Sequence, residues 1–184
     1  YDPFWAAAQD LDMAVGFHEG GSGASGMPTI GVDRFADSHG ARHIVSHTME
    51  MMMVAVSVIW GGVCERFPGV RIAFLESGGG WMAPWLDRMD RHYADKNFND
   101  SSLTMKPSDY FRRNCWISFE PVEETLTLLA DHLGADRILW GTDYPHLDGF
   151  YPGAPKMMID GRGFSHKTQR AILAEGAKGY YGLQ

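Results

Sequence analysis

Ionisable side chains follow four short apolar segments of the sequence. His18 comes directly after the first segment, Glu76 after the second and Glu120 after the third, while two residues separate Asp143 from the fourth. If these segments are parallel strands, their carboxyl ends meet at one edge of a sheet, where parallel α/β folds build active sites. Imidazole and carboxylate groups bind divalent metals and transfer protons. We therefore expect a metal-binding or catalytic site at this edge.

Each of these side chains also has a structural alternative. His18 can be an ordinary loop histidine, Glu76 a carboxylate at a helix N-terminus, and Glu120 the cap of the following helix. Three glycines after Glu76 (LESGGGW) allow close backbone approach, and the proline near Asp143 (WGTDYPH) restrains its turn. These contexts favour functional roles. We expect His146, on the same loop as Asp143, to contact substrate.

The other histidines give weaker signals. His43 and His47 are four residues apart, which places both on one helix face, but they lack the Glu of an H-E-x-x-H arrangement. We expect them to be solvated or to face substrate. The methionine-rich run Met49–Met53 is typical of a core or a subunit interface. Three further histidines are expected on the surface: His92, His132 and His166.

The apolar segments predict the strands of a parallel sheet, because continuous apolar runs suit strands covered on both faces. These segments are Met13–Phe17, Arg71–Leu75, Cys115–Phe119 and Arg137–Trp140. Helical spacing of apolar residues, together with cap and stop signals, predicts a helix after each strand. These helices are Ile44–Arg66, Trp81–Tyr93, Val122–Leu133 and Lys167–Tyr180, the last with Ser165 as its N-cap.

This alternation predicts an α/β fold with helical crossovers. The sheet is either open and doubly wound or part of a (β/α)8 barrel, which needs about 250 residues, so that four units make half of one. No G-x-G-x-x-G or G-x-x-x-x-G-K-[ST] motif follows a strand, which disfavours a nucleotide-binding open sheet. Two connections are long: Gly- and Ser-rich His18–His43, which is expected to be a lid or disordered, and polar Asn97–Pro107.

The composition fits a single domain over residues 1–184, with 45% hydrophobic and 21% charged residues. Lys and Arg total 16 against 23 Asp and Glu, a net charge of −7 that disfavours nucleic acid as a partner. Cys64 and Cys115 lack metal-binding spacing, so we expect buried reduced thiols and a cytoplasmic location. The longest apolar run, Met51–Val63, is too short to span a membrane.

The chain begins at Tyr1, and its first methionine, Met13, falls inside the first predicted strand. We do not expect translation to start inside a buried strand. A processed chain is one explanation. A fragment without its N-terminal part is the one we favour, because four βα units are half of a barrel.

Two motifs resemble a known family. The stretch WGGVCERFPGVRIAFLESGGGWMAPWLDRMDRHY and the later RILWGTDYPHLDG resemble the C-terminal half of an amidohydrolase-superfamily barrel. The resembling branch contains aminocarboxymuconate-semialdehyde decarboxylase and hydroxybenzoate-type decarboxylases. The resemblance, which starts near Met13, implies that the chain holds strands 5–8 of a (β/α)8 barrel. It also implies a divalent metal, usually zinc, with His18 and Asp143 as ligands.

Two features depart from the family pattern. The family's H-x-H ligand pair is absent from the chain, so strands 1–4 are expected before Tyr1. Family decarboxylases carry a histidine where this chain has Glu76, and a carboxylate can also accept a proton from a metal-activated water. The resemblance implies a hydrolase or decarboxylase for a small carboxylated or aromatic substrate, with Asp143 and Glu76 catalytic and His146 and Glu120 contacting substrate. With half of the metal site, the isolated chain is expected to bind metal poorly and to be inactive.

Two other functions stay open. A non-catalytic half-barrel that self-associates, for example as a homodimer, would bury its open sheet edges and its methionine-rich helix. An open-sheet hydrolase with a Ser or Cys nucleophile is disfavoured, because no G-x-S-x-G follows a strand and neither cysteine has a strand-end histidine nearby in the sequence.

Overall fold

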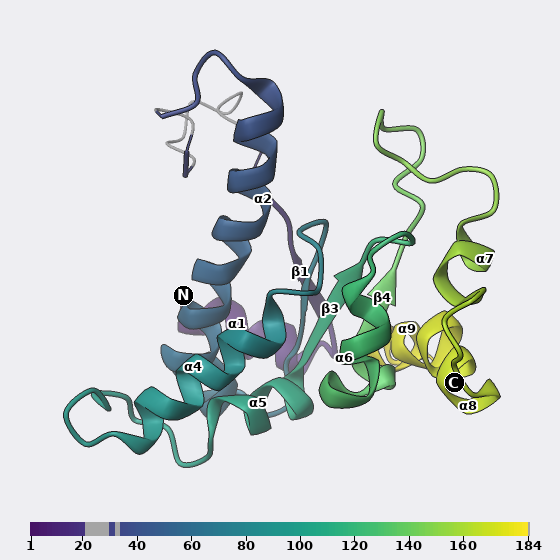
Figure 1. Ribbon diagram of the computed structural model, residues 1–184. Coiled ribbons are helices and arrows are strands. Elements are labelled where there is room, and N and C mark those ends of the chain that lie inside the picture. The colour runs from purple at the N-terminus through teal and green to yellow at the C-terminus, as the bar shows by residue number, and fades with distance from the viewer. Residues whose placement is uncertain (21–29, 32–33, 184) are drawn as a thin grey trace.

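The computed structural model describes residues 1–20, 30–31 and 34–183 of the chain. A parallel sheet of four strands, in the order β1-β2-β3-β4, lies at its centre (Figure 1). The strands are β1 (Ala14–Phe17), β2 (Arg71–Phe74), β3 (Cys115–Phe119) and β4 (Ile138–Trp140). All three neighbouring pairs are parallel, which confirms the predicted α/β sheet.

Helices precede, connect and follow the strands. Helix α1 (Asp2–Asp10) precedes β1, and α2 (His39–Ala55), the π-helical turn η1 (Val56–Trp60) and α3 (Val63–Arg66) connect β1 to β2. Next come α4 (Met82–Ala94) and α5 (Pro107–Asn114), then α6 (Thr125–Leu133) and the 3-10 turn η2 (Ala135–Arg137). After β4 follow α7 (Ala154–Ile159), α8 (His166–Arg170), the π-helical η3 (Ala171–Glu175) and α9 (Gly176–Tyr181).

The first predicted strand begins one residue too early. Met13 lies before β1 with 55% of its surface exposed, so the expectation that it falls inside a buried strand is wrong. Its backbone N–H donates to the carbonyl of Ala8. That bond ties Met13 to the end of α1 instead of to the sheet.

The long helix predicted at Ile44–Arg66 begins earlier and is interrupted. The side chain of Ser38 accepts a hydrogen bond from the backbone N–H of Ala41, which satisfies a free donor of the first turn, so the helix begins after Ser38. The helix breaks near Gly62, whose φ of 76° is readily adopted only by glycine. Ser165 caps α8 as predicted, whereas the helix predicted from Val122 begins later, at Thr125.

Three helices were not predicted: α1, α5 and α7. Helix α5 begins at Pro107, which ends the stretch expected to be a polar surface connection, and its Tyr110 and Phe111 are fully buried. Proline is favoured in the first helical turn because it has no N–H to leave unpaired. Part of the lid expected at His18–His43, residues 21–29 and 32–33, lies outside the described residues, and its last residues, from His39, belong to α2.

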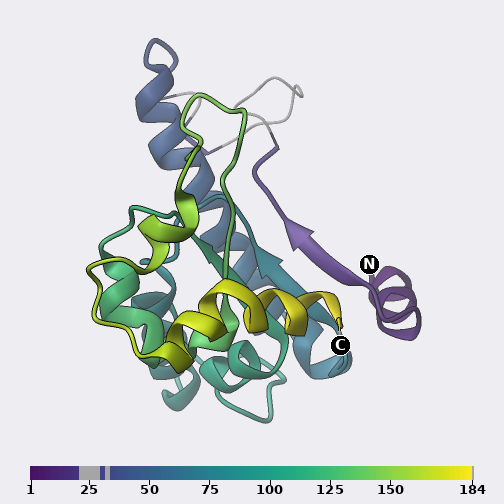
Figure 2. The same ribbon diagram turned by 90° about the vertical axis from the view of Figure 1, so that its right-hand side faces the viewer.

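The two faces of the sheet are covered differently. One face packs into the main core beneath the helices that connect the strands, with buried side chains from Ile72, Phe74, Ile117, Phe119 and Ile138. The other face carries Ala73, Trp116 and Leu139, which pack against Tyr180. That tyrosine comes from α9, which crosses in front of the sheet in Figure 2. The strands follow sequence order and every crossover lies on one face, so the sheet is wound in a single direction. In a doubly wound sheet, by contrast, the order of the strands reverses.

Helix α2 and η1 form one continuous helix of 22 residues, His39–Trp60, and the mean hydropathy of its 18-residue window is 1.2. Within the described ranges it is the one helix long and apolar enough to cross a membrane, and it is longer than the apolar run considered above. Length and composition alone are weak evidence, because core helices pass the same test. Met51, Ala55, Val58 and Ile59 of this helix are buried in the main core.

Candidate active site

A cavity of about 690 Å³ opens at the carboxyl ends of the strands. Its lining includes His18, Glu76, Glu120 and Asp143, so the structure brings all four strand-end side chains together. Parallel pairing is the physical reason, because it places every strand end at the same edge of the sheet.

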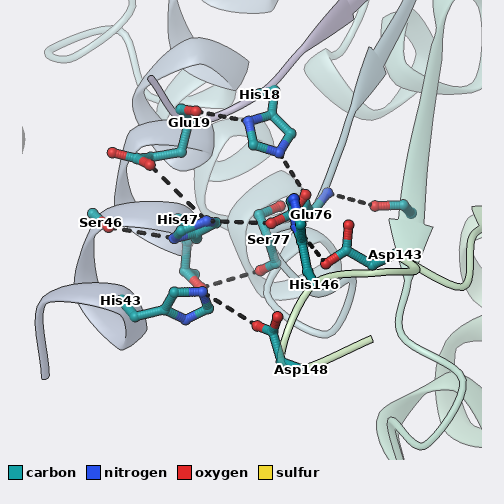
Figure 3. A network of polar contacts seen from close by, with 12 residues as sticks. His18, Glu19, His43, Ser46, His47, Glu76, Ser77, Asp143, His146 and Asp148 are labelled. Atoms are coloured by element: carbon teal, nitrogen blue, oxygen red, sulfur yellow. Dashed lines mark hydrogen bonds and ion pairs between the residues drawn. The ribbon is translucent and has the colours of Figure 1, made fainter. Parts of the chain in front are cut away.

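His18 and Glu76 are directly bonded (Figure 3). The His18 Nε2 atom lies 2.5 Å from Glu76 Oε2, and its Nδ1 lies 2.6 Å from the backbone oxygen of Glu19. A carbonyl and a carboxylate both accept hydrogen bonds, so these two neighbours favour a proton on each ring nitrogen. Desolvation lowers the pKa of His18, but the hydrogen bonds to Glu76 and to the Glu19 carbonyl outweigh it and the pKa is raised.

Glu76 and Asp143 both have left-handed backbones, with φ of 48° and 51°. Such conformations are uncommon outside glycine and occur at turns and functional sites. The backbone N–H of Glu76 donates to Ser118 Oγ at 2.9 Å, which ties the turn after β2 to β3. His146 N–H donates to the carbonyl oxygen of Asp143 at 2.9 Å, and the His146 Nδ1 atom lies 3.0 Å from Asp143 Oδ2.

Three of these residues can share a cation. Glu76, Asp143 and His146 each offer a ligand atom, and the three atoms lie within 4.8 Å of one another. Two carboxylate oxygens and an imidazole nitrogen form a donor set that suits zinc or manganese. Of the two predicted ligands, Asp143 belongs to this group. His18 does not, but its Nε2 contacts Glu76, a member of the group. The donor set therefore fits a divalent metal, with His18 beside it.

Glu120 is exposed and lies beside other acids. Its pKa is raised by desolvation and by the nearby charges of Glu123 and Asp148. The alternative in which Glu120 caps the next helix is wrong, because α6 begins only at Thr125. The carboxylate that holds this region is Glu123, which accepts hydrogen bonds from the backbone N–H groups of Gly79 and Gly80. The sequence contained no signal for this role, since the partners are more than forty residues apart.

His47 also belongs to the site, and its role was given too little weight from the sequence. It is buried, at 8% exposure, and lines the cavity. Its Nε2 lies 3.5 Å from Glu76 Oε1 and 3.9 Å from Glu19 Oε2. One turn earlier, His43 Nε2 lies 3.3 Å from Asp148 Oδ2. The four-residue spacing of the two histidines was the available signal, but it could not show which way their helix face points.

The remaining polar candidates lie away from the cavity. His132 and His166 are exposed as predicted, and His92 is half-buried with its ring bonded to the carbonyl of Arg88. Cys64 and Cys115 are free and buried, as predicted, and burial raises the pKa of the Cys115 thiol. Neither thiol is an accessible nucleophile.

Relatives of this chain include several decarboxylases. A 2-amino-3-carboxymuconate-6-semialdehyde decarboxylase from Dictyostelium discoideum is 26% identical over 183 residues, which are 98% of this chain and 48% of that protein. The chain thus spans about half the length of the curated relative it matches. The crystal structure of 5-carboxyvanillate decarboxylase from Sphingomonas paucimobilis matches with a TM-score of 0.76 and 26% identity, over 99% of this chain and 53% of the other.

Two further solved structures share the fold at lower identity. An amidohydrolase from Mycobacterium avium subsp. paratuberculosis matches with a TM-score of 0.79 and 23% identity, over 98% of this chain and 45% of the other. A dihydroxybenzoic acid decarboxylase from Polaromonas sp. was solved with bound manganese and the inhibitor 2-nitroresorcinol. It matches with a TM-score of 0.72 and 22% identity, over 98% of this chain and 53% of the other.

A family model extends these likenesses to almost the whole sequence. The model described as amidohydrolase matches residues 1–183. The match agrees with the resemblance noted in the two sequence motifs, and the chain belongs to the amidohydrolase family.

Proposed function

We propose that this chain supplies the C-terminal half of a metal-dependent hydrolase or decarboxylase acting on a small carboxylated or aromatic substrate. The observation that carries the proposal is the approach of ligand atoms from Glu76, Asp143 and His146 within 4.8 Å of one another. Glu76 and Asp143 of this group line the cavity at the carboxyl ends of the strands, in a chain of the amidohydrolase family.

A half-barrel is the architecture that supports this proposal. The strands follow sequence order and the crossovers share one face, as in an arc of a (β/α)8 barrel. Relatives about twice as long have room for the other half of such a barrel. In this proposal β1–β4 are strands 5–8, and residues 1–184 belong to one domain.

The chain's own residues divide the chemistry between them. His18 and Asp143 would hold the metal next to Glu76 and His146, and the bound metal would supply a more acidic water and polarise a substrate oxygen. Glu76 would act as the general base or orienting group, and Asp143 would move a proton to or from the substrate. His146 and Glu120 contact the substrate from the rim of the site. Zinc and manganese both suit these ligands.

The walls of the cavity favour an aromatic substrate. Aromatic rings from several elements line it: Trp81, Phe119, Trp140, Phe150 and Tyr181. Such walls bury flat apolar ligands while a few polar groups fix their orientation. Decarboxylation of an aromatic acid is the reaction named for several relatives.

Two experiments test the proposal. The coding DNA upstream of Tyr1 should continue in frame for about 100 residues or more and encode an H-x-H pair after a strand, as four further βα units require. The protein so defined should release CO2 from a hydroxylated benzoate, or hydrolyse a related amide or ester, in the presence of Mn²⁺ or Zn²⁺. Chelation or Asp143→Asn should lower kcat/KM by about 100-fold or more. Turnover that survives both changes rules the proposal out.

A specific observation supports self-association as a second function. The outer edges of β1 and β4 have no strand partner among the described residues. Helix α2 also exposes apolar side chains from Ile44, Met49 and Met53. Open edges and apolar helix faces favour pairing between copies. Sedimentation equilibrium should then show a homodimer, and a monomer at all concentrations would contradict this function.

A further inference from the structure

We propose that His47 is a positioning residue that holds the Glu76 carboxylate in its working orientation, with Glu19 buried behind it. The inference rests on the proposed function and deepens it. It assigns a role to a helix α2 side chain that is not among the strand-end residues.

The first argument is the placement of Glu76 between two imidazoles. His18 Nε2 lies 2.5 Å from one carboxylate oxygen and His47 Nε2 lies 3.5 Å from the other. Figure 3 shows both rings converging on this carboxylate from different elements. The two imidazoles face different oxygens of the same carboxylate, so the contact with His47 restricts its rotation independently of His18.

The second argument is the set of polar groups around the His47 ring. Its Nε2 faces two carboxylates, Glu76 at 3.5 Å and Glu19 at 3.9 Å. An imidazole N–H can donate to a carboxylate oxygen. The Nδ1 atom lies 3.4 Å from the hydroxyl of Ser46. The ring therefore has a polar neighbour at each nitrogen, as expected of a group that positions another.

The third argument is burial. The side chains of His47 and Glu19 are 11% and 1% exposed. Buried charged or polar groups cost free energy unless they are paired. The neighbouring Thr48 donates through its hydroxyl to the backbone oxygen of Ser77 at 3.1 Å. Two consecutive residues of α2 thus contact two consecutive residues of the turn after β2: His47 contacts Glu76, and Thr48 contacts Ser77.

The test compares two substitutions of His47 in the 184-residue protein. His47→Gln keeps an N–H donor near the position of Nε2, whereas His47→Leu keeps similar volume without a donor. Mn²⁺ titration followed by NMR line broadening should show an affinity about 10-fold weaker for His47→Leu and nearly unchanged for His47→Gln. His39→Leu, on the same helix but outside the cavity lining, is the matched control and should bind Mn²⁺ like the unaltered protein.

A metal-free readout separates this inference from the proposed function. In apo protein, the ¹³C shift of the Glu76 carboxyl carbon should change in His47→Leu and return in His47→Gln. If no Mn²⁺ binds but the carboxyl shift responds in this way, the positioning role stands and the metal proposal fails. If Mn²⁺ binds equally to unaltered protein and His47→Leu, and the Glu76 shift is unchanged, the positioning role is overturned. Equal losses in the Leu and Gln variants also overturn it, because they indicate packing.

Discussion

Glu123 is the side chain whose removal should most disturb the glycine turn after Glu76. Its carboxylate accepts hydrogen bonds from the N–H of Gly79 at 3.0 Å and from that of Gly80 at 2.7 Å. The hydroxyl of Thr125 donates to the same carboxylate at 2.7 Å. Glu123→Ala removes the acceptor and leaves both backbone donors unpaired.

The expected loss follows from these two backbone bonds. A hydrogen bond to a charged group contributes about 1.5–3 kcal/mol, so two give about 3–6 kcal/mol. Gly79 is buried, but Gly80 is half-buried and water can reach it. We therefore expect Glu123→Ala to lower the free energy of unfolding by about 2–4 kcal/mol. Glu123→Gln keeps one oxygen acceptor and should lose about half as much.

Urea unfolding followed by tryptophan fluorescence measures these losses. Glu124→Ala is the matched control, because Glu124 is the exposed neighbour of Glu123 and should change stability by less than about 0.5 kcal/mol. If Glu123→Ala and Glu124→Ala unfold at the same urea concentration with the same slope, the reasoning about the turn is refuted.

Three further predictions concern the same core and site. Gly79→Ala should lower the free energy of unfolding by about 2–3 kcal/mol in urea, because its Cβ would lie 2.1 Å from the buried Phe119 ring; an unchanged midpoint would contradict this contact. In metal-free protein the His18 ring should titrate by NMR above its ordinary pKa of about 6.5. Its bond to Glu76 then stabilises the fold below that pH, and this contribution disappears as pH rises through the raised pKa; titration at or below the ordinary value would disprove the bond. Burial raises the pKa of Tyr180 to about 12, so alkaline unfolding should set in between about pH 10 and 12 and shift upward in Tyr180→Phe; identical pH curves would exclude Tyr180 as the cause.

The sheet and the meeting of the strand-end residues could be predicted because both follow from local patterns. Apolar runs identify the strands, and parallel pairing sends His18, Glu76 and Asp143 to one edge whatever the details of the helices. The predicted strand boundaries were accurate to one residue. One of these single-residue errors mattered, because it placed Met13 inside a buried strand. The backbone bond from Met13 to Ala8 depends on α1, a helix that was not predicted.

The roles of His47 and Glu123 could not be predicted because they arise from contacts between distant segments. Glu123 holds Gly79 and Gly80 across more than forty residues, and its neighbours in sequence resemble an ordinary helix start. His47 reaches Glu76 because its face of α2 packs against the turn after β2, where Thr48 also bonds to Ser77. Spacing alone indicated a helix face, but tertiary packing determined which face meets the site.

Manganese binding to the 184-residue protein tests the central claim most directly, and NMR line broadening detects even the weak binding expected of half a site. Mn²⁺ should selectively broaden the backbone resonances of His18, Glu76, Asp143 and His146, and Asp143→Asn should abolish this pattern without unfolding the protein. Broadening that is absent, that spreads over the acidic surface, or that persists in Asp143→Asn would contradict a metal site at the carboxyl edge of the sheet.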